Sequence, residues 1–218
     1  MKSLLTPAVR VLTALLLSCS GLHAAMTMTV DWTVNSTIPD NNPTGLADTR
    51  TISGSSIGYI TSLEVHFETS GGWNGDLYAF LQHDSGFSVL LNRPGKTLLD
   101  MIGSSASGFN VTFTDDAVSD IHNVAGGGVI TGTYQVDARD VDPDTVLDTD
   151  SRTAYLSNFQ GLNANGDWTL FVADNASGDE ATLTSWGLTI NGTPEPSRAV
   201  LLMLGLLSMM MRRRKPGA

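Results

Sequence analysis

The sequence predicts an all-β fold, a β-sandwich or jelly roll, over most of its 218 residues. Large apolar side chains alternate with small or polar ones in many short segments, and this period of two is typical of strands with one buried face. Turns rich in Gly, Pro, Asn and Asp separate these segments. Outside the two ends, no long apolar pattern of helical period is found. We therefore expect two packed sheets and no helical layer.

The stretch 166–190 carries the clearest signal. It contains two alternating segments joined by the polar residues 174–179, whose types tolerate turns. Each segment brings one tryptophan, a large side chain suited to a core. We expect these two strands to form a hairpin that closes the sandwich, with its buried face made by Trp168, Leu170, Val172, Trp186, Leu188 and Ile190.

The same alternation recurs along the chain, which indicates a single domain. Strands are expected near residues 26–34, 59–67, 77–81, 88–91, 109–113 and 131–136. Turns are expected at 38–43, 70–76, 84–86 and 92–95, and residues 51–58 form a Ser/Gly-rich connection. One domain extends over residues 26–192, a length sufficient for a sizeable core.

The N-terminal end has the organisation of a secretory signal peptide. Residues 1–25 carry Lys2 and Arg10, then a short apolar run, then small residues up to Ala24 and Ala25. The only cysteine, Cys19, lies in this segment, so the protein without it has no thiol for disulfides, zinc or catalysis. Lipid attachment at Cys19 is a minor alternative, because the residues before it fit a lipobox only loosely.

The C-terminal end, residues 193–218, has the organisation of a membrane sorting signal. Pro194, Glu195 and Pro196 precede the apolar run 199–211, and four basic residues follow. This order resembles the PEP-CTERM signal of Gram-negative bacteria. The resemblance implies a short transmembrane helix in the inner membrane, cleavage by an exosortase, and release to the cell surface or the extracellular space. An ordinary single-pass anchor is the alternative.

Without its two ends the chain is strongly acidic. Seven of the 12 Lys and Arg but only one of the 22 Asp and Glu lie there, so five basic and 21 acidic residues remain, a net charge near −16. Such a surface repels nucleic acid and anionic lipid. We expect no nucleic-acid partner.

A series of polar and aromatic markers follows a fixed order along the chain. The markers are Asp40 after Ile-Pro, Asp76 in Gly-Asp-Leu, Asp115, Asp116, Trp168 in Gly-Asp-Trp-Thr-Leu, Asp174, Asp179 and Trp186 in Trp-Gly-Leu. This order resembles the P domain (P/Homo B domain) that follows the catalytic domain of subtilisin-like proprotein convertases. The resemblance spans residues 34–191, and it implies a jelly-roll-like β-sandwich without a catalytic triad. Leu183 follows Thr182 where that family commonly has glycine, so the last turn is expected to differ.

No catalytic motif is expected to function. Ser56 lies in a Gly-Ser-Ser-Ile-Gly match to the nucleophile elbow, but a strand pattern follows where that motif needs a helix. His66, His83 and His122 are scattered and are interpreted as packing or solvent-exposed residues. We predict that the chain is not an enzyme.

The acidic loop at Asp140, Asp142 and Asp144 is the first candidate for a bound cation, because Ca²⁺ prefers several oxygen ligands. It is not an EF-hand, since Thr145 stands where glycine is needed. A solvated acidic loop is the preferred alternative. The resemblance to P domains, some of which hold calcium, makes Asp40, Asp115 and Asp116 second candidates.

Trp73, in a Gly-rich turn, is a candidate for stacking on a sugar. Tyr78 and Phe87 could extend the same strip, but core packing is the preferred interpretation of these two residues. The predicted function is an exported, non-catalytic binding protein whose partner is an exopolysaccharide or an envelope protein. The alternative is a free-standing P domain that stabilises or targets a separate subtilisin-like serine protease.

Overall fold

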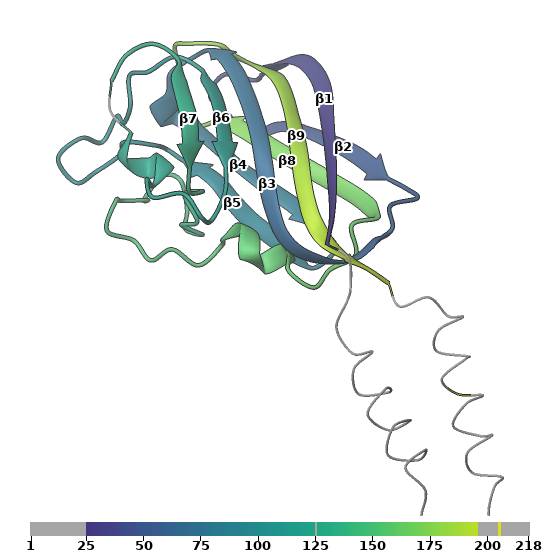
Figure 1. The fold of residues 1–218 in the computed structure, drawn as a ribbon. Coiled ribbons are helices and arrows are strands. Elements are labelled where there is room, and N and C mark those ends of the chain that lie inside the picture. Colours follow the sequence, from purple (N-terminus) through teal and green to yellow (C-terminus); the bar gives the residue numbers. More distant parts are fainter. Residues whose placement is uncertain (1–24, 125, 196–204, 206–218) are drawn as a thin grey trace, which may run out of the picture.

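The computed structural model describes residues 25–124, 126–195 and 205, and it confirms the all-β prediction with two packed sheets (Figure 1). In spatial order, the first sheet contains β1 (Met26–Ile38), β9 (Ala181–Pro194), β3 (Ile57–Gly71), β6 (Phe109–Phe113) and β7 (Ile130–Tyr134). The second contains β2 (Asn42–Ile52), β8 (Gly166–Asp174), β4 (Leu77–His83) and β5 (Gly86–Asn92).

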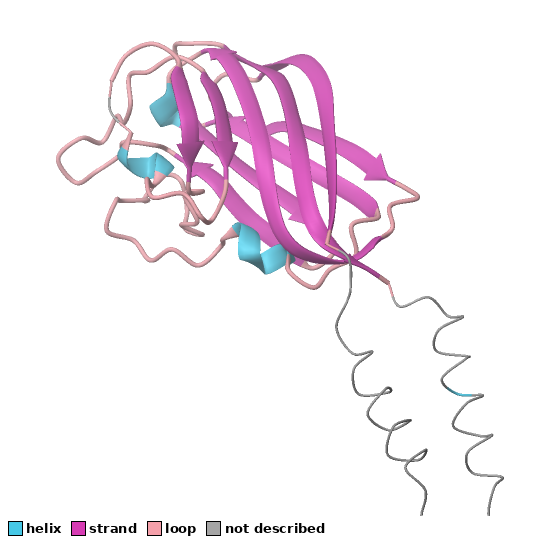
Figure 2. Cartoon of the chain, viewed as in Figure 1, coloured by secondary structure: helices cyan, strands magenta, loops and turns pink. Residues whose placement is uncertain are grey.

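Apart from Gly205, which is helical, helix in the described residues is confined to three short 3₁₀ turns (Figure 2). These are η1 (Asn74–Asp76), η2 (Ile121–Asn123) and η3 (Leu156–Phe159). All neighbouring strands are antiparallel except β6 and β7, which are parallel. The described residues contain no helix long and apolar enough to cross a membrane. The predicted signal peptide and the apolar run of the sorting signal lie outside the described residues, apart from Ala25 and Gly205.

The expected hairpin at 166–190 is wrong, although both strands exist. β8 pairs with β2 and β4, whereas β9 pairs with β1 and β3 in the opposite sheet. The polar connection therefore passes from one sheet to the other. Alternation fixes which face of a strand is buried, but either sheet of a sandwich satisfies it equally. The predicted buried positions are confirmed, and both Trp168 and Trp186 are fully buried.

One further detail differs from the sequence prediction. β2 was not predicted, because its less exposed positions include Asp48 and Arg50, which interrupt the apolar alternation. β9 ends at Pro194, which pairs with Ile57. A proline as the last residue of a strand costs little, because the ladder ends there.

Trp186 joins the two sheets. Its ring lies 4.5 Å from that of Trp32 on β1, and its indole Nε1 donates a 2.6 Å hydrogen bond to Asp48 Oδ2 on β2. Arg50 Nε donates to the same carboxylate oxygen at 2.8 Å. Trp186 therefore combines a large apolar contact with a hydrogen bond across the sandwich.

The chain enters and leaves the sandwich at one end. Met26 at the start of β1 pairs with Gly192 near the end of β9. The long loops that follow β5 and β7 protrude at the other end (Figure 1). We refer to the described residues of 93–108, 114–129 and 135–155 as the loop end.

Candidate functional site

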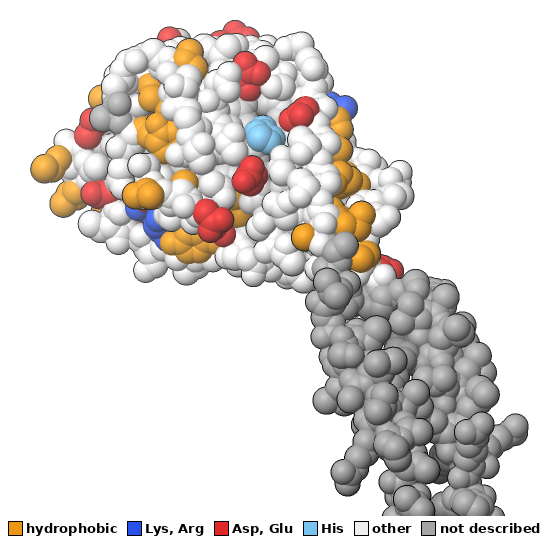
Figure 3. Space-filling view, in the orientation of Figure 1, with side chains coloured by type: hydrophobic (Ala, Val, Ile, Leu, Met, Phe, Trp, Pro, Cys, Tyr) orange, Lys and Arg blue, Asp and Glu red, His pale blue; other side chains and the backbone are white. Residues whose placement is uncertain are grey.

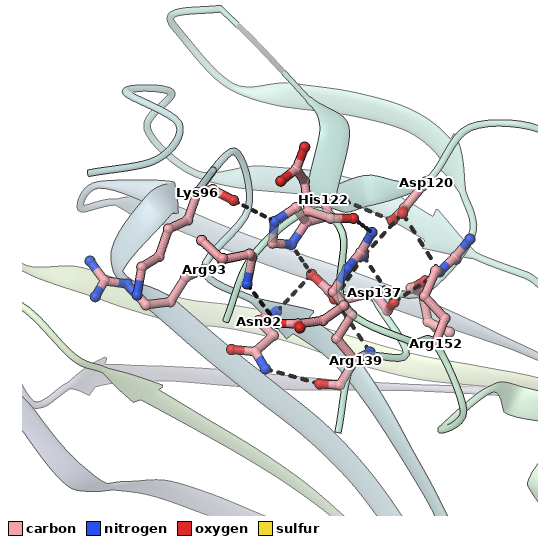
Figure 4. Close-up of polar contacts among 12 residues, drawn as sticks. Asn92, Arg93, Lys96, Asp120, His122, Asp137, Arg139 and Arg152 are labelled. Carbon is pink, nitrogen blue, oxygen red and sulfur yellow. Dashed lines mark hydrogen bonds and ion pairs between the residues drawn. The ribbon is translucent and has the colours of Figure 1, made fainter. Parts of the chain in front are cut away.

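Buried charged side chains gather at the loop end (Figure 4). Full burial of charge is rare in proteins unless each group has a partner. The set comes from all three loops, and we call it the charge network: Lys96, Asp120, His122, Asp137, Arg139 and Arg152.

His122 is the centre of the network. Its Nδ1 lies 2.7 Å from Asp137 Oδ2 and its Nε2 lies 2.8 Å from the Lys96 carbonyl oxygen. Because both partners only accept, both ring nitrogens donate and the imidazole is charged. Burial is the largest influence on its pKa and opposes the charge. The hydrogen bond and charge of Asp137, with the Lys96 carbonyl, outweigh burial and raise the pKa of His122.

Asp137 also holds Arg139. The Arg139 Nη1 atom lies 3.1 Å from Asp137 Oδ1 and 3.0 Å from Asp120 Oδ2, and its Nη2 donates to the Asp148 carbonyl at 2.8 Å. Arg152 adds a 3.6 Å contact to Asp120. Two carboxylates therefore face three cations, and the loops on which they lie are fixed to one another.

Lys96 enters the acidic loop for which calcium was predicted. Its buried ammonium donates to the carbonyl oxygens of Pro143 at 3.0 Å and Asp144 at 2.7 Å. Burial, with the repulsion of Arg93, lowers the pKa of Lys96 against the attraction of Asp144 and Asp142. The Lys96 ammonium thus binds carbonyl oxygens of the loop that was predicted to bind calcium.

The six predicted metal ligands lie in three separate segments of the chain and do not converge on one site in the described residues. Asp115 accepts the backbone N–H groups of Leu156 and Ser157 at η3, and Asp40 accepts that of Gly178. Asp116 is exposed, and the carboxylate of Asp142 accepts the N–H of Asp144 in a local turn that leaves Asp140 exposed. In residues 25–124 and 126–195, no three His, Cys, Asp or Glu side chains are arranged to hold a metal ion. Calcium binding stays a prediction.

The structure brings together a carboxylate pair that sequence reasoning had not connected. Asp174 is fully buried at the end of β8; its Oδ1 accepts the Ala176 N–H at 3.1 Å, and its Oδ2 has no hydrogen-bond partner. The neighbouring Asp76 contacts Arg93 Nη2 at 3.2 Å. Burial raises the pKa of Asp76 to about 6 despite Arg93, and the charge of Asp174 adds to the rise. Burial also raises the pKa of Asp174, with a contribution from Asp40.

This pair is the best place to test for calcium. If Ca²⁺ contacts Asp174 Oδ2, a concentration of 100 times the dissociation constant stabilises the fold by about 2.7 kcal/mol. Thermal melts of the wild type should then show a rise of roughly 5–10 °C between chelator and calcium. Asp174→Asn should abolish this rise without losing stability in chelator, because it removes an unpaired buried charge. Asp84→Asn is the control, because Asp84 is exposed in the turn between β4 and β5. An equal calcium response in Asp174→Asn would rule the pair out.

The predicted aromatic strip is present only in part. Tyr78, Phe80, Phe87 and Phe171 are half-buried residues of β4, β5 and β8, and Phe80 stacks on Phe171 with 4.8 Å between ring centres. The ring contacts do not extend to Trp73, which precedes η1 and has a buried Nε1 without a partner. Tyr78 and Phe87 therefore belong to a cluster of their own.

The structure also places His83, His66 and Ser56. His83 stacks on Trp168 with 3.9 Å between ring centres, and His66 lies between Thr112 and Thr189 on the outer face of the first sheet. Ser56 is exposed and directly precedes β3, so the strand expected after the Gly-Ser-Ser-Ile-Gly match is confirmed.

A pocket of about 500 Å³ lies beside the charge network, between η2 and β7. Asp120, Tyr134 and Arg152 contribute to its lining. Arg152 donates to Gln135 Oε1 and to the carbonyl oxygens of Val136 and Asp137. Its guanidinium is therefore already engaged and does not make this pocket an anion site.

Comparison with known proteins finds resemblances in structure and in sequence. No curated protein matches the chain. The serine protease of Aeromonas sobria is 16% identical with a TM-score of 0.46, over 84% of this chain and 30% of that one. The complex of that protease with its chaperone gives 14% identity and a TM-score of 0.45, over 83% and 29%. The chain thus spans less than a third of the length of these matched chains. By sequence, residues 138–190 match the proprotein convertase P-domain, a non-catalytic part of those proteases.

Proposed function

We propose that the chain is an exported, non-catalytic accessory protein that binds another macromolecule through its loop end. The observation that carries the proposal is the charge network. Six charged side chains, four of them buried, hold three loops in fixed positions at one end of the sandwich. Fixed loops reduce the ordering cost of binding. The P-domain match at residues 138–190, which includes Arg139 and Arg152, supports an accessory role.

Export is the second part of the proposal. The signal peptide at 1–25 directs the chain out of the cytoplasm, and the PEP-CTERM signal at 193–218 holds an inner-membrane precursor until an exosortase cleaves it. The mature protein is then found at the cell surface or outside the cell. Its partner there is an exopolysaccharide or an envelope protein.

The P-domain match favours one further candidate. Residues 138–190 resemble a module that follows a protease domain, so the chain would serve a separately encoded subtilisin-like serine protease by stabilising or targeting it. In both cases the chain itself performs no chemistry.

One culture tests both parts. The tagged chain is expressed in its own host and recovered from the extracellular fraction, where its intact mass should lack both ends. A fluorophosphonate label, specific for active serine hydrolases, should mark a co-eluting protein if the protease candidate is right. Retention on the host exopolysaccharide, reduced by Trp73→Ala, would indicate the sugar candidate. Secreted material that retains the arginine-rich tail, or labelling of this chain itself, would contradict the proposal.

A further inference from the structure

The loop after β5 exposes four large apolar side chains within five residues. The exposed fractions are 76% for Leu98, 98% for Leu99, 53% for Met101 and 64% for Ile102. We call these four residues the apolar tip. Single exposed apolar residues are ordinary, but a contiguous group marks an interaction site.

Hydrogen bonds within the loop hold the apolar tip in a defined conformation. The backbone N–H of Thr97 donates to the Asp100 carbonyl at 2.8 Å, and that of Asp100 donates to the Thr97 carbonyl at 3.2 Å. The Thr97 hydroxyl accepts from Leu99 and Asp100, and Asp100 Oδ1 accepts from Ile102 and Gly103. Polar groups of the loop therefore satisfy one another, while the apolar side chains are left for contact outside the chain.

The base of the tip is held by the charge network. Gly95 N–H donates to the His122 carbonyl at 2.6 Å, and Ser104 N–H donates to the Pro94 carbonyl at 2.7 Å. Lys96 draws the acidic loop of Asp142 and Asp144 against the same segment through the Pro143 and Asp144 carbonyls. The apolar tip thus stands beside carboxylates.

The described residues offer no free basic side chain elsewhere. Residues 25–195 contain all 22 acidic residues and five of the 12 basic ones, a net charge of −17. Each of the five already donates to oxygens of the same chain. The contacts are Arg50 to Asp48, Arg93 to Asp76 and Gly75, Lys96 to Pro143 and Asp144, Arg139 to Asp120 and Asp137, and Arg152 to Gln135 and Val136.

From this combination we infer that the apolar tip inserts into an apolar recess of another protein whose border carries lysine and arginine side chains. The inference rests on the proposed function and names the chemistry of its partner. A second copy of this sandwich would bring the same negative charge and no free basic side chain to the contact. An anionic bilayer would repel Asp142 and Asp144 next to the tip. A basic border instead complements them.

The test uses the purified full-length chain and three synthetic amphipathic peptides of one length, made from Leu and Lys, Ser and Lys, or Leu and Glu. Binding is measured by fluorescence anisotropy against the wild type and against a variant with Leu98→Ser, Leu99→Ser, Met101→Ser and Ile102→Ser. Val118→Ser is the matched control, because Val118 is 98% exposed outside the tip.

The Leu/Lys peptide should bind the wild type best, and the fourfold variant should weaken it by about tenfold or more. Val118→Ser should leave binding within about twofold of the wild type, since its side chain lies outside the contact. The fourfold variant should melt within about 2 °C of the wild type, because the exchanged side chains are exposed.

Equal affinity of wild type and fourfold variant for the Leu/Lys peptide would overturn the inference. Two other results would also overturn it. The first is wild-type binding to phosphatidylcholine or phosphatidylglycerol vesicles that is lost in the fourfold variant, because the tip would then bind lipid. The second is self-association of the wild type that is lost in the fourfold variant, because the tip would then bind a second copy of the chain. If the fourfold variant still binds the exopolysaccharide or still co-elutes with the fluorophosphonate-labelled hydrolase, the inference about the apolar tip is wrong, whereas the proposed function is unaffected.

Discussion

Replacing Asp137 with asparagine is expected to lower the free energy of unfolding by about 3–5 kcal/mol, because it leaves two buried cations without their shared carboxylate. His122 Nδ1 lies 2.7 Å from Asp137 and Arg139 Nη1 lies 3.1 Å from it. In a domain of this size the melting temperature should fall by roughly 10 °C. Urea unfolding followed by tryptophan fluorescence measures the change.

The same variant should alter the pH dependence of stability. The pKa of His122 is raised in the folded state above its ordinary value of 6.5. The stabilisation from its charge is therefore fully present below about pH 6.5 and is lost as the pH rises through the folded pKa. Asp137→Asn should remove this decline. Asp140→Asn is the control, since Asp140 is exposed on the same loop. An unchanged decline in Asp137→Asn would mean that another group causes it.

Asp76 gives a separate decline at lower pH. Its pKa rises from 3.8 to about 6 on folding, so the folded state retains this proton while the unfolded state loses it. Stability should therefore fall as the pH rises between these two values and then level off. The decline caused by Asp76 should lie at lower pH than the decline caused by His122.

The second large effect is expected for Trp186→Ala, which should lower the free energy of unfolding by about 3–5 kcal/mol. The change removes a fully buried ring, its contact with Trp32 and its hydrogen bond to Asp48 across the sandwich. Guanidinium unfolding measures it. Trp186→Phe should cost less, because it keeps most of the apolar contact and loses the hydrogen bond.

Tyr59→Ala is the matched control, because Tyr59 lies on β3 of the same sheet and is 50% exposed. Its loss should change stability by about 0.5 kcal/mol or less. If Trp186→Ala costs no more than Tyr59→Ala, the tryptophan does not hold the two sheets together.

The sequence was sufficient to predict the fold class and most of its strands. Trp168 and Trp186 were placed in the core correctly, because alternation records which side of a strand faces away from water. The pairing of their strands was missed because a period of two does not say which sheet a strand joins. β2 was missed because Asp48 and Arg50 occupy its less exposed positions. There Asp48 accepts hydrogen bonds from Trp186 and from Arg50.

The candidate site was far less predictable than the fold. Asp137 and His122 are only 15 residues apart, yet nothing in the spacing indicates that His122 also bonds the Lys96 carbonyl. Lys96 stands alone in a Pro-Gly-Lys turn, and its partners lie more than 40 residues further on. Such contacts form only when separate loops meet. One visible signal was overlooked: Leu98, Leu99, Met101 and Ile102 form an apolar run without the alternation of a strand.

Both ends of the sandwich chain emerge together, next to the pairs Met26–Gly192 and Ile57–Pro194. In a precursor tethered to a bilayer by either terminus, this end of the sandwich would face the bilayer and the loop end would face the surrounding medium (Figure 1). In Figure 3 apolar and acidic side chains share that distal region. Cleavage of the tether would allow the protein to diffuse away from the bilayer, but the same surface would remain exposed to other molecules.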